Sequence, residues 1–243
     1  MMTINRIILA KILIMCSVMG YAQNFINKGV ITYERKVQIH KVLEGNSWAK
    51  NNIESFPKFY VSTFDLKFNH DTSIYTKTSE DDQKSGSWAV YSKDNEIITF
   101  FAFEQNIVKR AIYSDVYTVK DSLPKINWKL VNETRMIAGI ECKKATAIIN
   151  DSIFVVAFYS ERIQISGGPE QFNGLPGMIL GVVVPRLHVS YYAQKVTSME
   201  NQTTPMPKQK KQSMTRKEFE EMVMKNMKWA FTNSGIGVLY LFL

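Results

Sequence analysis

The sequence predicts a mainly β fold: a curved antiparallel sheet, half-barrel or sandwich-like, with a C-terminal amphipathic helix. Three observations support this. Short alternating apolar segments are separated by polar turns, β-branched and aromatic residues are concentrated in those segments, and one helical pattern appears near the end of the chain. No repeat of 20–50 residues is present, which argues against a solenoid or propeller. Regular short strands of this kind are typical of sandwiches, barrels and curved open sheets.

The strands follow one another along most of the chain. Residues 29–39 alternate, and Phe64, Leu66 and Phe68 lie on one face of the next strand. A polar turn at residues 69–71 leads into a strand over 72–77, so this pair predicts a hairpin. Further strands are expected over 88–91, 96–103, 111–119, 128–131, 141–149, 153–159, 178–184 and 187–192.

The C-terminal part changes character. Residues 199–213 are polar and basic and predict a linker or loop. Within 214–243, Thr215 and Glu218 form a capping box that begins a helix, which is expected to end near residues 233–235. Its apolar stripe is expected to pack on the sheet, although a methionine-rich stripe is also compatible with peptide or lipid binding. The stripe consists of Phe219, Met222, Val223, Met227, Ala230 and Phe231. The apolar tail 238–243 is expected to dock as a final strand.

The N-terminus carries an export signal. A short basic region with Arg6 precedes apolar residues 7–19, and small residues follow at Gly20 and Ala22. This layout predicts a signal peptide over 1–22 that is cleaved near Ala22-Gln23, which leaves a periplasmic or secreted protein whose β-rich domain covers 23–198. The alternative is a buried N-terminal helix. Lipid attachment at Cys16 is not expected, because a bulky residue precedes it.

The cysteine count and the net charge restrict the bonds and partners that are expected for this chain. Removal of residues 1–22 leaves Cys142 alone, so no internal disulfide forms, and a buried apolar role is favoured over a reactive thiol. The net charge of +8 includes a basic cluster at Lys208, Lys210 and Lys211. An exported protein rarely meets nucleic acid, so we expect no nucleic-acid partner. A solvated basic loop is the favoured interpretation, and contact with an anionic membrane surface is the preferred functional one.

One loop stands out. Residues 163–180 hold four of the twelve glycines together with Pro169 and Pro176. Proline fixes φ and glycine accepts positive φ, so residues 175–178 suit a type II turn. The Leu175 side chain is then well placed to fill a concave sheet. The candidate binding residues are Gly174, Leu175, Pro176, Gly177 and Met178.

Residues 174–179 resemble the signature of the GLPGLI family, small exported proteins typical of Bacteroidota. Spaced blocks upstream are also similar to that family, and the resemblance covers roughly residues 28–195. The blocks are Trp128-Lys129-Leu130, residues 137–146, Phe158-Tyr159, residues 165–169 and Phe172. Departures are Met178 for leucine, Ile140 for tyrosine, Gly168 inserted where a polar residue is common, and residues 182–185 in place of an acidic hairpin. The resemblance implies an envelope location and a β-rich fold, and it transfers no catalytic residue.

The chemistry-bearing residues are scattered. His40, His70 and His188 lie far apart in the sequence and form no metal-ligand motif, and no nucleophile elbow, P-loop or dinucleotide fingerprint is present. We therefore expect no cofactor, no metal and no catalytic residue recognisable from the sequence, although a carboxylate pair that meets only in space stays open.

The preferred function is an exported, non-catalytic binding or carrier module, with an apolar ligand or partner segment on the concave face. A lipid or an envelope protein is the expected partner, and the oligomeric state is left open. Two alternatives are a hydrolase whose site is assembled across strands and a docking partner of an outer-membrane complex.

Overall fold

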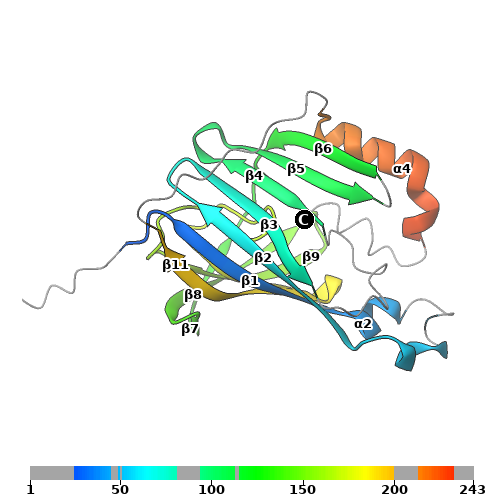
Figure 1. The fold of residues 1–243 in the computed structure, drawn as a ribbon, viewed down its shortest axis with the longest axis horizontal. Helices are drawn as coiled ribbons and strands as arrows, with labels where there is room; N and C mark the ends of the chain where they lie inside the picture. Colours follow the sequence, from blue (N-terminus) through cyan, green and yellow to red (C-terminus); the bar gives the residue numbers. More distant parts are fainter. Residues whose placement is uncertain are drawn as a thin grey trace, which may run out of the picture.

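The computed structural model describes residues 25–44, 49, 51–80, 94–112, 115–199 and 213–232. Within these ranges, 11 strands form one antiparallel sheet that curves strongly and leaves β6 and β7 as its two edges (Figure 1). Helix α4 lies against the β6 edge. The predicted mainly β fold with a C-terminal helix is confirmed.

The strands run in the order β6-β5-β4-β3-β2-β1-β11-β10-β9-β8-β7 across the sheet. Their bounds are β1 Gly29–Gln38, β2 Phe59–Phe68, β3 Thr72–Glu80, β4 Glu96–Phe100, β5 Gln105–Ile112, β6 Asp115–Ser122, β7 Lys129–Ile137, β8 Ile140–Ile149, β9 Ile153–Ser160, β10 Met178–Val184 and β11 Val189–Ser198. The helices whose bounds lie in the described residues are α2 (Ile39–Leu43) and α4 (Arg216–Thr232), with 3-10 turns η1 (Ile53–Ser55), η3 (Phe101–Phe103) and η4 (Pro185–Leu187).

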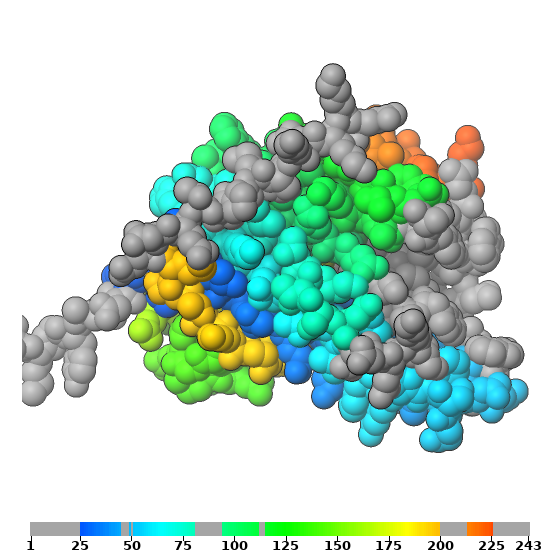
Figure 2. Space-filling view, viewed as in Figure 1, coloured from blue at the N-terminus to red at the C-terminus, as the bar shows by residue number. Residues whose placement is uncertain are grey.

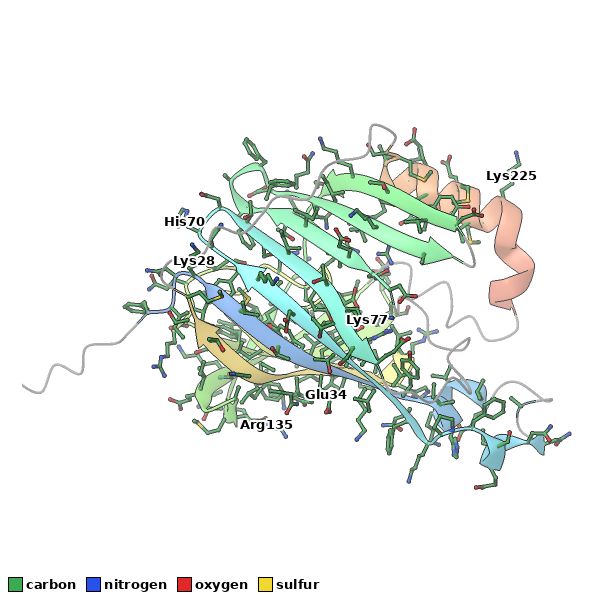
Figure 3. The ribbon with its side chains drawn as sticks, in the orientation of Figure 1. Lys28, Glu34, His70, Lys77, Arg135 and Lys225 are labelled. Carbon is green, nitrogen blue, oxygen red and sulfur yellow. The ribbon has the colours of Figure 1, made fainter. Side chains whose placement is uncertain are left out.

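Alternation along β1 decides which side chains point inward. Ile31, Tyr33 and Arg35 are fully buried, whereas Glu34 lies on the opposite face (Figure 3). The Tyr33 hydroxyl donates a 2.6 Å hydrogen bond to the carbonyl of Ile179, which ties β1 to β10. Burial of each large apolar side chain stabilises the fold by about 1.5–3 kcal/mol, so the inward face supplies much of the stability.

Two large apolar clusters form the core. The first joins β1, β9, β10 and β11 and contains Val155, Val182 and Tyr191. The second joins β2, β3 and α4; in it the rings of Phe64 and Tyr75 stack with centroids 4.7 Å apart. Figure 2 shows one face of the molecule, on which the atoms of β1 and β2 lie side by side and part of α4 is visible at the upper right.

The local sequence patterns predict several elements correctly. The hairpin over residues 64–77 is formed by β2 and β3, and the Asn69 side-chain oxygen accepts from the backbone N–H groups of Asp71 and Thr72 in its turn. Two predicted strands are shorter than expected. Residues 111–119 are divided between β5 and β6, and residues 101–103 form a 3-10 turn that ends at Glu104 with a φ of +46°.

Helix α4 begins as predicted. The backbone N–H of Thr215 donates to the Glu218 carboxylate, and the backbone N–H of Glu218 donates to the Thr215 hydroxyl, so the capping box is confirmed. Phe219 is buried and meets the Tyr117 ring edge-on at 5.8 Å. Met214 pairs with the backbone of β6 just before the helix, so part of this sheet edge is covered.

Four sequence predictions lie outside the described residues. They are the signal peptide over 1–22, the strand over 88–91, the basic cluster at Lys208, Lys210 and Lys211, and the apolar tail 238–243. Among the described helices, none combines the length and the apolar character needed to cross a membrane.

Cys142 is buried, as predicted, and burial raises the pKa of its thiol to about 12. Because the thiolate is the nucleophile, we expect Cys142 to resist iodoacetamide in the native protein at pH 8 and to react rapidly after unfolding in urea. Peptide mass spectrometry with and without urea measures this difference. Equal labelling in both conditions would contradict the buried placement.

Candidate functional site

The loop over residues 161–177, between β9 and β10, enters the concave side of the sheet. Leu175 is 2 % exposed and Phe172 is 3 % exposed, and the Phe172 ring meets Tyr191 of β11 at 6.5 Å. Leu175 therefore fills the concave sheet as predicted. The surface where we expected an apolar ligand is occupied by the chain's own loop.

A buried carboxylate joins this loop to the sheet. Glu170 has a left-handed φ of +52° and is 2 % exposed, and its Oε2 accepts a 2.9 Å hydrogen bond from Asn95 Nδ2. Burial raises the pKa of Glu170, while the positive charges of Arg35 and Arg110 and the bond from Asn95 oppose that shift. Both arginines are themselves buried, so opposite charges attract across a low-dielectric interior and fix the loop.

A short connection crosses the open side of the sheet. It consists of residues 123–128, here called the crossing segment, and it joins β6 to β7, the two edges of the sheet. Even when fully extended it spans at most roughly 25 Å, so the two edges are held close together. The segment is fixed to the loop, because Trp128 Nε1 donates to the Asn173 carbonyl at 2.8 Å and Asn173 Nδ2 donates to the Pro124 carbonyl at 3.2 Å.

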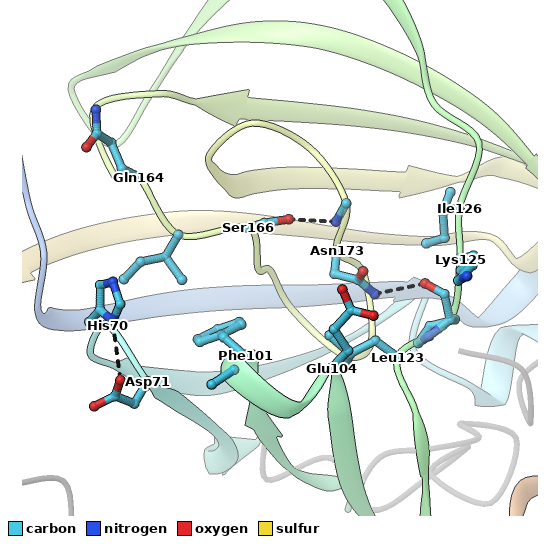
Figure 4. A pocket seen from close by; sticks show the side chains of 14 residues that line it. His70, Asp71, Phe101, Glu104, Leu123, Lys125, Ile126, Gln164, Ser166 and Asn173 are labelled. Carbon is cyan, nitrogen blue, oxygen red and sulfur yellow. Dashed lines mark hydrogen bonds and ion pairs between the residues drawn. The ribbon is translucent and has the colours of Figure 1, made fainter.

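A groove of about 580 Å³ lies between the crossing segment, the loop and the ends of β3 and β4 (Figure 4). This volume is within the usual range of small-molecule sites. Its lining residues are His70, Asp71, Phe101, Ala102, Glu104, Leu123, Pro124, Lys125, Ile126, Gln164, Ile165, Ser166, Asn173 and Gly174.

The groove offers donors and acceptors around one aromatic ring. The half-buried Phe101 ring packs on Gly167, where an added Cβ would lie 3.3 Å from the ring. Ser166 Oγ accepts from the Gly174 N–H at 2.9 Å, which leaves its hydroxyl hydrogen to donate to a ligand. Gln164 is exposed and can donate and accept, and the exposed Glu104 carboxylate accepts.

The five candidate binding residues predicted from the sequence differ in their exposure to solvent. Gly174, with a φ of +92°, lines the groove, and Pro176 is exposed. Leu175, Gly177 and Met178 are buried. The binding role of these five residues stays a prediction.

The turn itself differs from the predicted type II geometry. The Gly177 N–H donates to the Leu175 carbonyl at 2.8 Å, and the Met178 N–H bonds instead to Ile163. The turn is therefore one residue tighter than predicted. The positive φ at Gly177 is confirmed, at +148°.

Sequence reasoning missed the other groove residues. Phe101, Glu104, Lys125 and Asn173 come from three distant segments, and the crossing segment and the sheet order bring them together. His70, predicted to lie in a turn, also lines the groove. Within the described ranges, His, Cys, Asp and Glu side chains form no group of three suited to a metal ion.

The family of the chain is decided by a match to one family model. The model described as "N-glycanase peptide, N-terminal domain" matches residues 68–226, which include the groove, the loop and the start of α4. The chain belongs to this family. A comparison with curated proteins gave no match.

Solved structures similar to this N-glycanase N-terminal domain chain include two of PNGF-II. The structure in space group C2 is 15 % identical in sequence, with a TM-score of 0.47. The aligned region covers 72 % of this chain and 28 % of the PNGF-II chain. The structure in space group P21 is 14 % identical, with a TM-score of 0.48, and the aligned region covers 73 % of this chain and 29 % of the PNGF-II chain. The chain therefore spans less than a third of the PNGF-II chains.

The resemblance to the GLPGLI family was wrong. The matching model is that of the N-glycanase N-terminal domain, and no comparison shows a GLPGLI family. The misleading motif has a local physical cause. Gly174 and Gly177 both require positive φ and Leu175 fills the core, so the geometry of this turn favours such a sequence.

Proposed function

We propose that this chain is a non-catalytic glycan-binding module whose ligand lies in the groove between the crossing segment and the loop. The observation that carries the proposal is the groove itself, which combines the Phe101 ring with the polar groups of Gln164, Ser166 and Glu104. Sugars present hydroxyl groups that both donate and accept hydrogen bonds, along with apolar ring faces that pack on aromatic rings. The lining matches both kinds of surface.

The position of the carboxylates favours binding over catalysis. A glycosidase requires two carboxyl groups, one of which is kept protonated by its surroundings. In the groove, the Asp71 side chain is 78 % exposed and Glu104 is also exposed, so both are open to solvent. These groups suit hydrogen bonding to a sugar better than proton transfer.

Family membership supports a glycan as the ligand, since the family takes its name from an N-glycanase. A binding module would give such an enzyme, or a separate exported protein, contact with glycosylated surfaces. Export through the predicted signal peptide, with a periplasmic or secreted location, belongs to the same proposal. Contact of Lys208, Lys210 and Lys211 with anionic membrane surfaces, and association with a lipid or an envelope protein, stay proposals independent of the groove.

Isothermal titration of the protein with a high-mannose N-glycan tests the proposal. We expect binding by the wild-type chain and roughly five- to tenfold weaker binding by Gln164→Ala, since one lost hydrogen bond is worth about 1 kcal/mol. Gln194→Ala is the matched control, because Gln194 is an exposed glutamine on β11 outside the groove.

Three outcomes would overturn the proposal. They are no binding of the glycan, equal weakening by the two glutamine variants, and release of the glycan from an N-glycopeptide during incubation. Mass spectrometry of the glycopeptide before and after incubation detects the last of these, which would make the chain a hydrolase.

A further inference from the structure

A second cavity lies on the other side of the crossing segment. It measures about 540 Å³ and shares Pro124, Lys125 and Ile126 with the groove. The remaining lining comes from Asn127 of the crossing segment, from residues 148–151, from Gln171 and Phe172 of the loop, and from Arg216 and Glu220 of α4. The two cavities are thus adjacent, and the crossing segment lines both of them.

The wall of the second cavity holds a preorganised donor. Gln171 is 7 % exposed, and its Oε1 accepts from Asn106 Nδ2 at 2.8 Å and from Arg216 Nη2 at 3.0 Å. The Arg216 backbone N–H also donates to Asp121 Oδ2 at 2.9 Å. Arg216 is therefore held at its backbone by Asp121 and at its guanidinium by Gln171, which lowers the entropy lost when it binds a ligand.

An acceptor stands beside this donor. Glu220 follows Arg216 by one helical turn and lines the same cavity. Partial burial raises the pKa of Glu220, and the charge of Arg216 opposes that shift. The Arg216 guanidinium can donate to one sugar hydroxyl, while the Glu220 carboxylate accepts from a neighbouring one.

From these features we infer that the second cavity is a further sugar subsite, and that the ligand is an oligosaccharide long enough to cross Lys125 and occupy both cavities. This inference rests on the proposed glycan binding. The exposed Lys125 side chain lines both cavities and lies where the ligand passes from one to the other.

Titration of the full chain with two probes tests the inference. The probes are a high-mannose N-glycan and the disaccharide N,N′-diacetylchitobiose. We expect Glu220→Gln to weaken binding of the N-glycan about tenfold and binding of the disaccharide less than twofold, because the disaccharide fills only the groove. Gln164→Ala should weaken both probes.

The matched control is Glu221→Gln, because Glu221 is the exposed neighbour on α4 and lies 4.0 Å from Lys217, outside both cavities. Asn127→Ala is a second variant of the same cavity; Asn127 is exposed and does not belong to α4, so its result is independent of helix stability. The inference would be overturned if Glu220→Gln weakened binding of the two probes equally, or if neither Glu220→Gln nor Asn127→Ala weakened binding of the N-glycan. Both results would leave groove binding intact. If the wild-type chain bound neither probe, the proposed function itself would be wrong.

Discussion

Replacement of Glu170 by alanine is expected to lower the free energy of unfolding by about 3–5 kcal/mol, because it removes a buried carboxylate whose charge acts on the buried Arg35 and Arg110. Arg35 and Arg110 are 0 % and 4 % exposed, and burial already lowers the pKa of Arg110 to about 10. Asn95 also loses its acceptor. Urea denaturation at pH 7, followed by tryptophan fluorescence, measures the change.

Glu161→Ala is the control for this prediction. Glu161 pairs with Lys143 at 2.8 Å, but the two side chains are 49 % and 54 % exposed, so we expect a loss below about 1 kcal/mol. Similar losses of unfolding free energy for the two variants would contradict the prediction, because the buried charges would then contribute no more than an exposed ion pair.

Glu170→Gln separates charge from size. The folded-state pKa of Glu170 lies above its ordinary value of 4.5, so the native state binds the proton more readily than the unfolded chain does. The contribution of this group is therefore fully present below pH 4.5 and decreases as the pH rises through the folded-state pKa. The glutamine variant should lack this component of the pH dependence.

Gly177→Ala is expected to destabilise the fold by about 3 kcal/mol or more. An added Cβ would lie 2.3 Å from the Ser160 carbonyl oxygen and 2.7 Å from its carbon, and these backbone atoms belong to the end of β9. The positive φ adds strain of its own, and strain and overpacking each cost about 1–3 kcal/mol. The shift of the unfolding midpoint in urea measures the combined cost of strain and overpacking.

Gly139→Ala provides the comparison. Gly139 has a φ of +74°, yet an added Cβ there would meet no atom within 4 Å. We expect a loss of about 1–2 kcal/mol from the left-handed backbone alone. If Gly177→Ala cost no more than Gly139→Ala, the close approach to Ser160 would have to be relieved by a backbone shift.

Local patterns predicted the local structure well. The alternation around Tyr33, the turn at Asn69 and the capping box at Thr215 depend on residues only a few positions apart, and all three are confirmed. The stripe on α4 also begins as expected, with Phe219 and Val223 buried. These signals reflect the periods of strands and helices, which the sequence displays directly.

Long-range features were beyond such patterns. The pairing of β1 with β11 and the crossing segment depend on contacts between residues far apart in the chain. The buried charges are an example: Arg35 acts on Glu170 electrostatically, but the two residues lie far apart in the chain, so no local pattern relates them. The groove was missed for the same reason, since Glu104 and Gln164 become neighbours only after folding.

The strand order has a consequence for the kinetics of folding. Strands β1 to β6 form one run of neighbouring hairpins and β7 to β11 form another. In the sheet, the two runs pair through β1 and β11, from Gly29 opposite Ser198 to Val37 opposite Val189. Each run can form from contacts of short sequence separation, whereas joining them closes a loop of most of the chain. The association of the two halves is thus the slow, high-contact-order step, and until it occurs β1 and β11 are exposed edges on which chaperones, or other copies of the chain, can act.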